Sequence, residues 1–412
     1  MKYEASKRKN ILVVLIGVIL ILCIGLFVKN RMNTLNNASI NEESIVEELD
    51  DNLIGAYIQQ GEEYVKADTI PTSGYEFNAE ESYCKIGDAI QEDMTLFYDM
   101  DTQTLNVAPL TTKGTKCYLY FDEQASAGET ILASANAPTN STTDWTNNGQ
   151  GVTYYYTGNP NNWVQFAGFY WRIIRINGDG TIRMIYQGTD ANTTGSETQI
   201  GTNAFNDPYR DVCYIGFKYT RGELHGLSNN STILGEDASN DTTTLNGWYR
   251  VNLLKYTDYI DGNAGFCGDR TIYSGSGIYP EETYYSAYNR VENENMPSLQ
   301  CDIRDIYTTT NSSDGNKSLQ YPIGLVTVDE LFLSESLNST SSYLYTGQQF
   351  WTMTPCYTSG YAVLYFADPR GYFYNANADS DMGVRPVINL KSSIAIMGSG
   401  TTTDPFKVVG AS

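Results

Sequence analysis

Apolar residues run without interruption from Ile11 to Val28, with no charge and no proline among them. An α-helix of this length spans roughly 27 Å, which is close to the hydrocarbon thickness of a bilayer. Four basic residues precede the run, whereas only Lys29 and Arg31 follow it closely, so the positive-inside bias places the rest of the chain outside the cytoplasm. We therefore predict a cytoplasmic tail over 1–10 and an uncleaved transmembrane signal anchor over 11–28. A cleaved secretory signal is the alternative.

The next pattern has the helical period. Between Asn41 and Gln60, apolar residues recur about every 3.6 positions among acidic ones, which predicts an amphipathic helix. We expect it to form part of a helical stalk over 41–66, ended by Pro71 and Gly74.

From residue 67 to 122 the pattern changes to period two. The segments MTLFYDMD, QTLNVAPL and KCYLYFDE alternate apolar and polar positions and are separated by turn residues. This is typical of short antiparallel strands and predicts a small β-sandwich-like (Ig-like) module.

A linker over 123–150, rich in Ala, Thr, Asn and Ser, holds one expected short helix at GETILASA. The final domain, 151–412, then opens on a hairpin. The strand 163–176 leads through the turn Asn177-Gly178-Asp179-Gly180 into TIRMIYQG, which is the strongest local structural signal in the chain.

Helices are expected at 246–260 and at 325–336, the latter with a capping box formed by Thr327 and Glu330. Residues 270–320 are typical of long loops, and the chain returns to strands from Phe350 onward.

The charge composition of the chain indicates which classes of binding partner are compatible with it. The formal net charge is −22, with 26 basic residues against 48 acidic ones. Nucleic-acid binding needs clustered Lys and Arg, so nucleic acid is excluded as a partner. The 33 tyrosines and 36 glycines favour a turn-rich chain, and Tyr, Asn and Ser together resemble the contact chemistry of antibody loops.

Cysteine usage fits an exported chain. Six cysteines lie outside the hydrophobic run, and three disulfides are the economical interpretation, although six cysteines allow fifteen pairings. Proximity in sequence favours Cys84–Cys117 and Cys267–Cys301, which leaves Cys213–Cys356. No CxxC pair occurs, so a thiolate zinc site is disfavoured.

Several blocks of the last domain resemble an uncharacterised surface-protein family of Firmicutes-like bacteria. These blocks are the entry hairpin from Trp163, FCGDR at 266–270, YPIGLVTVDE at 321–330, FWTMTP at 350–355 and GVRPVINL at 383–390. Together they span most of 150–410. The family has no assigned activity.

The last two blocks are also similar to the formylglycine-generating-enzyme branch of the C-type-lectin-like fold. That resemblance implies a mixed α/β domain whose long loops project from one end. Such a fold hosts enzymes, sugar binders and adhesins, so it does not settle function. The enzyme branch uses a reactive cysteine pair, and nothing marks Cys213 or Cys356 as reactive.

Candidate catalytic residues are few. His225 is the only histidine, and we interpret it as a solvated loop residue rather than part of a triad. No nucleophile elbow and no phosphate-binding glycine loop occurs.

Asn375, Asn377, Asp379 and Asp381 alternate with small residues and offer oxygen ligands of the kind calcium prefers. The pattern departs from the EF-hand at Met382 and Ile388. An exposed strand edge is therefore the favoured interpretation, and calcium, the only cofactor considered, is the alternative.

The same strip carries aromatic, amide and charged side chains, which suit sugar hydroxyls and protein epitopes alike. We predict a ligand-binding face formed by Tyr361, Tyr365, Asp368, Arg370, Tyr372, Tyr374 and Asn375. The alternative is that Tyr361 and Tyr365 point into the core.

The sequence thus predicts an α+β protein: an N-terminal transmembrane helix, a small β module and a C-type-lectin-like mixed domain. The predicted function is non-catalytic binding of an extracellular glycan or protein ligand by a membrane-anchored surface protein. A cell-envelope enzyme and a structural surface component are the alternatives.

Overall fold

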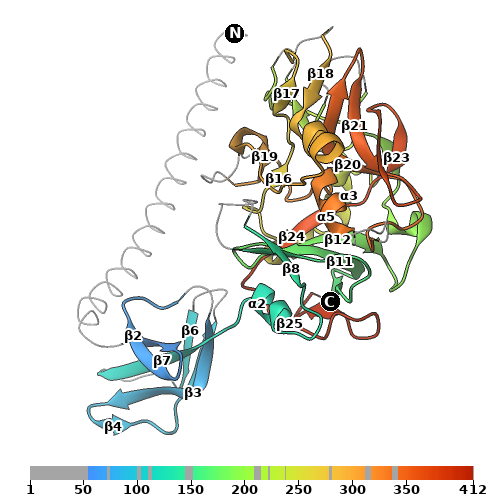
Figure 1. Ribbon diagram of the computed structural model, residues 1–412. Coiled ribbons are helices and arrows are strands. Elements are labelled where there is room, and N and C mark those ends of the chain that lie inside the picture. Colours follow the sequence, from blue (N-terminus) through green and yellow to red (C-terminus); the bar gives the residue numbers. More distant parts are fainter. Residues whose placement is uncertain are drawn as a thin grey trace, which may run out of the picture. The chain divides into compact units, whose positions relative to one another are not determined.

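The computed structural model describes residues 54–71, 75–99, 104–109, 114–143, 152–207, 215–220, 223–236, 238–277, 281–310, 316, 318–335 and 342–411. The chain divides into two compact units, 1–124 and 125–412 (Figure 1).

The fold class predicted from the sequence is wrong. The structure is mostly β, with 39% of residues in strands and 14% in helices, rather than α+β. Within the described ranges, no helix is long and apolar enough to cross a bilayer, and the run Ile11–Val28 lies outside them. Loops rich in Tyr, Thr and Asn pair into short strands instead of packing as helices, because β-branched and aromatic side chains fit a pleated surface.

The N-terminal unit is built on a five-stranded sheet with the order β2-β1-β7-β3-β4. Its strands are β1 Ile54–Gln60, β2 Glu63–Ala67, β3 Tyr75–Ile86, β4 Ala89–Ile90 and β7 Thr115–Glu123. A separate hairpin pairs β5 Thr95–Asp99 with β6 Thr104–Ala108. Alternate residues of β7 are buried, and Leu119 and Phe121 form the centre of a small core. The expected disulfide Cys84–Cys117 joins β3 to β7.

The helix expected over 41–60 is contradicted where the structure describes it. Residues Ile54–Gln60 form strand β1, which pairs parallel to β7 and antiparallel to β2. Gly55 weakens a helix here, and the tertiary partners on both sides of the strand supply the backbone hydrogen bonds that a helix would have made internally.

The larger unit begins with α2, Ala127–Leu132, the short helix expected in the linker. Its first sheet contains the predicted hairpin, formed by β11 Phe169–Ile176 and β12 Ile182–Gly188. Around it lie β8 Asn140–Thr142, β9 Thr153–Tyr155, β10 Trp163–Phe166, β24 Val387–Leu390, β25 Ile396–Met397 and β26 Phe406–Val408. The main order is β24-β12-β11-β10-β26-β25, so the last strands of the chain flank the first strands of the unit.

A second, seven-stranded sheet holds the strand-forming segments near the C-terminus. It contains β13 Thr202–Ala204, β17 Ile272–Ser274, β18 Thr283–Tyr285, β20 Phe350–Thr358, β21 Ala362–Ala367, β22 Phe373–Asn377 and β23 Asp381–Gly383. Two short pairs lie apart from it: β14 Lys218–Tyr219 with β15 Asn229–Asn230, and β16 Phe266–Cys267 with β19 Ile306–Tyr307.

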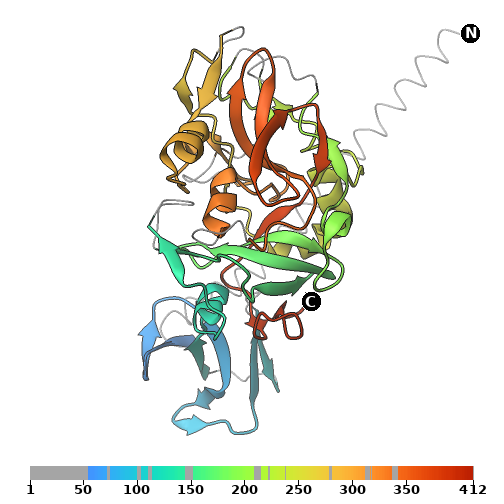
Figure 2. The same cartoon turned by 45° about the vertical axis from the view of Figure 1, so that its right-hand side comes forward.

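The helices of this unit are short. After α2 they are α3 Leu245–Asn252, α4 Ser286–Tyr288 and α5 Val328–Ser334, together with the 3-10 helices η1 Gly195–Thr198, η3 Leu254–Tyr259 and η5 Ile303–Asp305 and the π-helix η4 Asn289–Glu294. The segment expected to be helical at 246–260 is thus α3 followed by η3. Figures 1 and 2 show α5 between the two larger sheets. The core beside it includes Trp171, Trp351 and Tyr249.

Of the two remaining disulfide predictions, one is confirmed. Cys267 and Cys301 are bonded and join β16 to the loop before η5. Cys356 is a free, fully buried thiol on β20, so the predicted Cys213–Cys356 bond is wrong, and Cys213 lies outside the described residues. That pair was predicted only because these two cysteines remained after the other four were paired, and such a remainder carries no information on distance.

Candidate functional site

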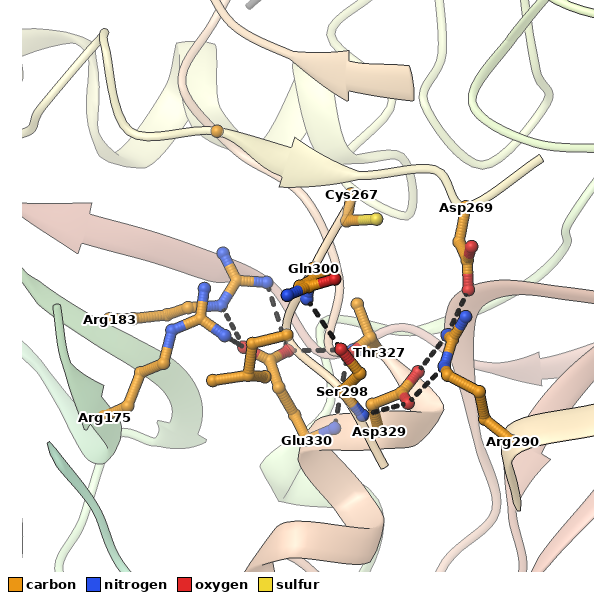
Figure 3. Close-up of a pocket in the computed structure, with 12 residues that line it drawn as sticks. Arg175, Arg183, Cys267, Asp269, Arg290, Ser298, Gln300, Thr327, Asp329 and Glu330 are labelled. Atoms are coloured by element: carbon orange, nitrogen blue, oxygen red, sulfur yellow. Dashed lines mark hydrogen bonds and ion pairs between the residues drawn. The ribbon is translucent and has the colours of Figure 1, made fainter. Parts of the chain in front are cut away.

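Two sets of side chains in the larger unit merit comparison as candidate sites. The first is a buried ionic cluster at the N-terminus of α5 (Figure 3). Glu330 accepts from Arg175 at 2.6 Å and from Arg183 at 2.5 Å, and all three side chains are almost completely buried. Glu330 also closes the predicted capping box by accepting from the backbone N–H of Thr327.

A third cation, Arg290, extends this ionic cluster. Arg290 lies between Asp269 and Asp329 and donates to both (Figure 3). Asp329 also accepts from the backbone N–H of Ser298 at 2.9 Å. The loops on either side of the Cys267–Cys301 disulfide are therefore fixed to α5 by charge-assisted hydrogen bonds.

The pKa values in the ionic cluster move in opposite directions. Burial alone would raise the pKa of Glu330, but the charges of Arg183 and Arg175 outweigh burial and hold this pKa below its usual range. For Asp269 burial prevails over the attraction of Arg290, and its pKa rises to about 6.

The cavity at the ionic cluster has a volume of only about 20 Å³. That is room for about one water molecule. Because its charges already pair with one another and no ligand fits, this cluster supports the fold rather than binding a substrate.

The second set surrounds an open cavity of about 530 Å³ at one end of the first sheet, which we call the Trp163 pocket. Ligand pockets usually fall between about 300 and 1,000 Å³. Its lining comes from five segments: the loop before β10, the strands β10 to β12, the loop before η1, the loop before β20, and the C-terminal loop. The lining residues are Gly158, Asn159, Pro160, Asn161, Trp163, Arg172, Gln187, Asn192, Thr193, Thr194, Ser342, Tyr343, Tyr345, Thr346 and Thr402.

The floor of the Trp163 pocket is rigid. Trp163, Arg172, Gln187 and Tyr343 are all buried there. The hydroxyl of Tyr343 donates to the backbone carbonyl of Ile173 at 3.0 Å, and Gln187 donates to the carbonyl of Thr193 at 2.9 Å. These bonds fix the floor before any ligand arrives, which lowers the entropic cost of binding.

The rim of the Trp163 pocket is polar and uncharged. Asn159, Asn192 and Thr194 are exposed, and within the described ranges none of their side chains makes a hydrogen bond. Amide and hydroxyl groups at the mouth are thus free to bind a ligand.

The ligand-binding residues expected from the sequence lie on the hairpin of β21 and β22. Tyr361, Arg370, Tyr372, Tyr374 and Asn375 are exposed. The Arg370 guanidinium lies 5.6 Å from the centre of the Tyr374 ring and 6.0 Å from that of Tyr372. Arg370, Tyr372 and Tyr374 thus form one exposed cluster, which we call the hairpin surface. Asn375 faces the opposite side of β22 from Tyr374, and Tyr361 lies at the other end of β21 from the turn that carries Arg370.

The other two expected residues, Tyr365 and Asp368, are buried. Tyr365 is fully buried, and its hydroxyl donates to Glu292. Asp368 is buried in the hairpin turn, where it accepts from the backbone N–H groups of Arg370 and Tyr372 as well as from the Arg370 side chain. Both side chains support the hairpin instead of facing a ligand.

The candidate calcium ligands Asn375, Asn377, Asp379 and Asp381 are exposed along β22 and the turn into β23. No group of three or more His, Cys, Asp or Glu side chains in the described chain is arranged to hold a metal ion.

His225 is not a solvated loop residue, contrary to the expectation. Its Nδ1 lies 2.7 Å from Oδ1 of Asp305, and Asp305 also accepts from the backbone N–H of Arg270. Sequence gave no sign of this pairing, because 80 positions separate the two residues.

The Trp163 pocket has no counterpart among the sites predicted from the sequence. Its residues come from five separate segments, and no local pattern links them. The one available signal was the sequence Asn159-Pro160-Asn161-Asn162 directly before the strand at Trp163, a run of turn and amide residues at a strand entrance.

No family model, curated protein or solved structure matches this chain. The resemblance to bacterial surface proteins and to the C-type-lectin-like fold therefore stays a prediction from sequence blocks.

Proposed function

We propose that this protein is an extracytoplasmic recognition protein that binds a glycan in the Trp163 pocket. The observation that carries the proposal is an open cavity of about 530 Å³ with an aromatic floor and an uncharged amide and hydroxyl rim. Aromatic rings pack against the apolar faces of sugars, while amides and hydroxyls pair with their hydroxyl groups.

The location proposed for this function follows from cysteine chemistry. The described chain holds two disulfides, Cys84–Cys117 and Cys267–Cys301. Disulfides persist in oxidising compartments and are rare in the cytosol, so we place binding outside the cytoplasm.

The enzymatic alternative receives little support from the residues that could perform catalysis. His225 does not line the Trp163 pocket, and Cys356 is a buried thiol whose pKa burial raises to about 12. A thiol held protonated in this way is a poor nucleophile.

The experiment is a glycan-array screen with the purified chain and two tryptophan variants. Thr194→Trp places a large ring at the exposed mouth of the Trp163 pocket. Met296→Trp, the matched control, adds the same ring at an exposed position outside the pocket.

We expect the wild-type chain to bind a defined set of glycans, Thr194→Trp to lose at least tenfold in affinity, and Met296→Trp to stay within twofold. Array binding that is unchanged in Thr194→Trp, or the absence of any bound glycan, would overturn the proposal.

Protein recognition through the hairpin surface is a second candidate function. It is favoured by the exposed Arg370 beside Tyr372 and Tyr374, since Arg and Tyr are enriched at the energetic centres of protein interfaces. Replacing both tyrosines by alanine would abolish binding of a protein partner and leave glycan binding intact. Loss of glycan binding in this variant would move the sugar site to the hairpin.

A further inference from the structure

Arg172 lies on β11 and has only 4% of its surface exposed. Its guanidinium carbon is 4.3 Å from the centre of the Trp163 ring and 4.8 Å from that of Tyr343. Nε donates to the side-chain oxygen of Asn162, and Nη2 donates to the carbonyl of Pro160 at 2.8 Å. All of these partners are neutral.

The same sheet shows what a buried arginine usually needs. Arg175 is three residues further along β11 and Arg183 lies on the adjacent strand, and both pair with the carboxylate of Glu330. Arg172 has no such partner: across the described chain, no Asp or Glu forms an ion pair with it, and no hydrogen bond uses its Nη1. Burying a charge without a counter-charge is costly.

A second uncompensated cation lies directly behind the floor. Arg385 is fully buried and donates to the carbonyls of Tyr186 and Leu344 and, at 2.7 Å, to the side-chain oxygen of Gln187. Gln187 lines the Trp163 pocket, so it connects this charge to the pocket floor. Burial lowers the pKa of Arg172 to about 10 and that of Arg385 to about 9, and both therefore remain charged at neutral pH.

Acidic side chains are absent from the described lining of the Trp163 pocket, although Glu335 accepts from the hydroxyl of the lining residue Tyr345 at 2.8 Å. The chain contains 48 acidic residues and carries a net charge of −22, yet none of the described residues that line the pocket is Asp or Glu. The pocket is thus a local positive site in an acidic protein.

We propose that the Trp163 pocket selects a sugar that bears a carboxylate, which pairs with the guanidinium of Arg172. This inference rests on the proposed glycan-binding function and adds the class of ligand. A planar carboxylate matches the fork of a guanidinium, and a single arginine among neutral amides suits one negative charge better than a dianionic phosphate.

The test compares two ligands that differ only at the carboxyl groups, a galacturonic acid oligosaccharide and its methyl ester. Each is titrated calorimetrically into the full chain. We expect the acid to bind at least tenfold more tightly than the ester at neutral pH. Added salt should weaken binding of the acid and leave that of the ester unchanged. Sialyllactose against its methyl ester provides a second matched pair.

Two variants assign the charge effect to Arg172. In Arg172→Gln we expect the acid and the ester to bind equally, whereas Arg172→Lys keeps part of the preference. If Arg172→Gln does not fold, as judged by circular dichroism, the wild-type comparison of acid with ester decides alone.

The outcomes separate the two proposals. Equal binding of acid and ester by the wild-type chain, abolished by Thr194→Trp, would overturn the inference and leave glycan binding in the Trp163 pocket intact. Binding of neither the matched acids and esters nor any arrayed glycan would overturn both. A preference for sulfated over carboxylated sugars would also contradict the assignment of a carboxylate.

Discussion

Among single side chains, Glu330 is the one whose loss we expect to cost the most stability. It pairs with two buried arginines and also caps its own helix. Removing one partner of a buried ion pair leaves a charge without compensation, which is more damaging than losing an exposed pair.

Replacing Glu330 by Gln is therefore predicted to reduce the free energy of unfolding by about 3–5 kcal/mol. The measurement is urea unfolding at pH 7, with Glu281→Gln as the control, because Glu281 is exposed. Equal stability of the two variants would show that Arg175 and Arg183 do not depend on this carboxylate.

Protonation of Glu330 at low pH is expected to destabilise the protein. Folding lowers the pKa of Glu330 below its ordinary value of 4.5, so its stabilising contribution is complete above pH 4.5 and is lost as the pH falls through the folded-state pKa. Wild-type stability should fall in this window, and the Glu330→Gln variant should lose less there. Parallel pH profiles for both chains would contradict this account.

Asp269 is predicted to change stability with pH in the opposite direction from Glu330. Folding raises its pKa from 3.8 to about 6, so the native state holds the proton more tightly and stability falls as the pH rises through this interval. Asp269→Asn should remove this loss and be at least as stable as the wild type at pH 7. Asp329→Asn removes the negative charge that Arg290 pairs with and replaces one acceptor oxygen by an amide that donates, so this variant should be destabilised throughout. Similar profiles for the two variants would refute the distinction.

At the level of elements, helices and strands that local sequence signals specify could be predicted, whereas those that depend on long-range contacts could not. The hairpin of β11 and β12 and the capping box of α5 were both predictable, because a turn sequence and a three-residue spacing fix them locally. Strand β1 was not, since its helical periodicity is overridden by pairing with β7, about sixty positions away.

The N-terminal cap of α5 is predicted to contribute to the stability of the protein. Thr327→Ala removes the hydroxyl that accepts from the backbone N–H of Glu330 and should cost about 1 kcal/mol of unfolding free energy. Thr327→Ser keeps the hydroxyl and should retain most of the stability in the same urea assay. Equal losses in Ala and Ser would mean that the methyl group, and not the cap, matters at this position.

The residues of the candidate sites show the same contrast between local and long-range information. Exposed Tyr372, Tyr374 and Arg370 were predictable because they lie in one short segment of alternating residues. The Trp163 pocket was not, because Arg172 on β11 and Tyr343 before β20 meet only through the fold. Burial of Tyr365 and Asp368 likewise depends on partners that the alternation does not specify.

For the whole molecule, cysteine chemistry gives a direct check on the fold. Cys84–Cys117 and Cys267–Cys301 followed from sequence proximity, whereas elimination failed for Cys356 because that side chain is enclosed in the core.

We predict that Cys356 resists alkylation in the native chain and reacts fully once urea unfolds it, because the thiol is buried and burial raises its pKa to about 12. Mass spectrometry of tryptic peptides under non-reducing conditions provides the measurement. Recovery of Cys356 in a disulfide-linked peptide would contradict the structure of β20.

The central claim, that the Trp163 pocket binds an acidic sugar, is tested most directly by a crystal structure of the protein with a galacturonic acid oligosaccharide. The account predicts that the sugar lies in the Trp163 pocket, with its carboxylate within hydrogen-bond distance of the Arg172 guanidinium. A sugar bound at the hairpin surface, or one in the Trp163 pocket with its carboxylate turned toward solvent, would contradict it.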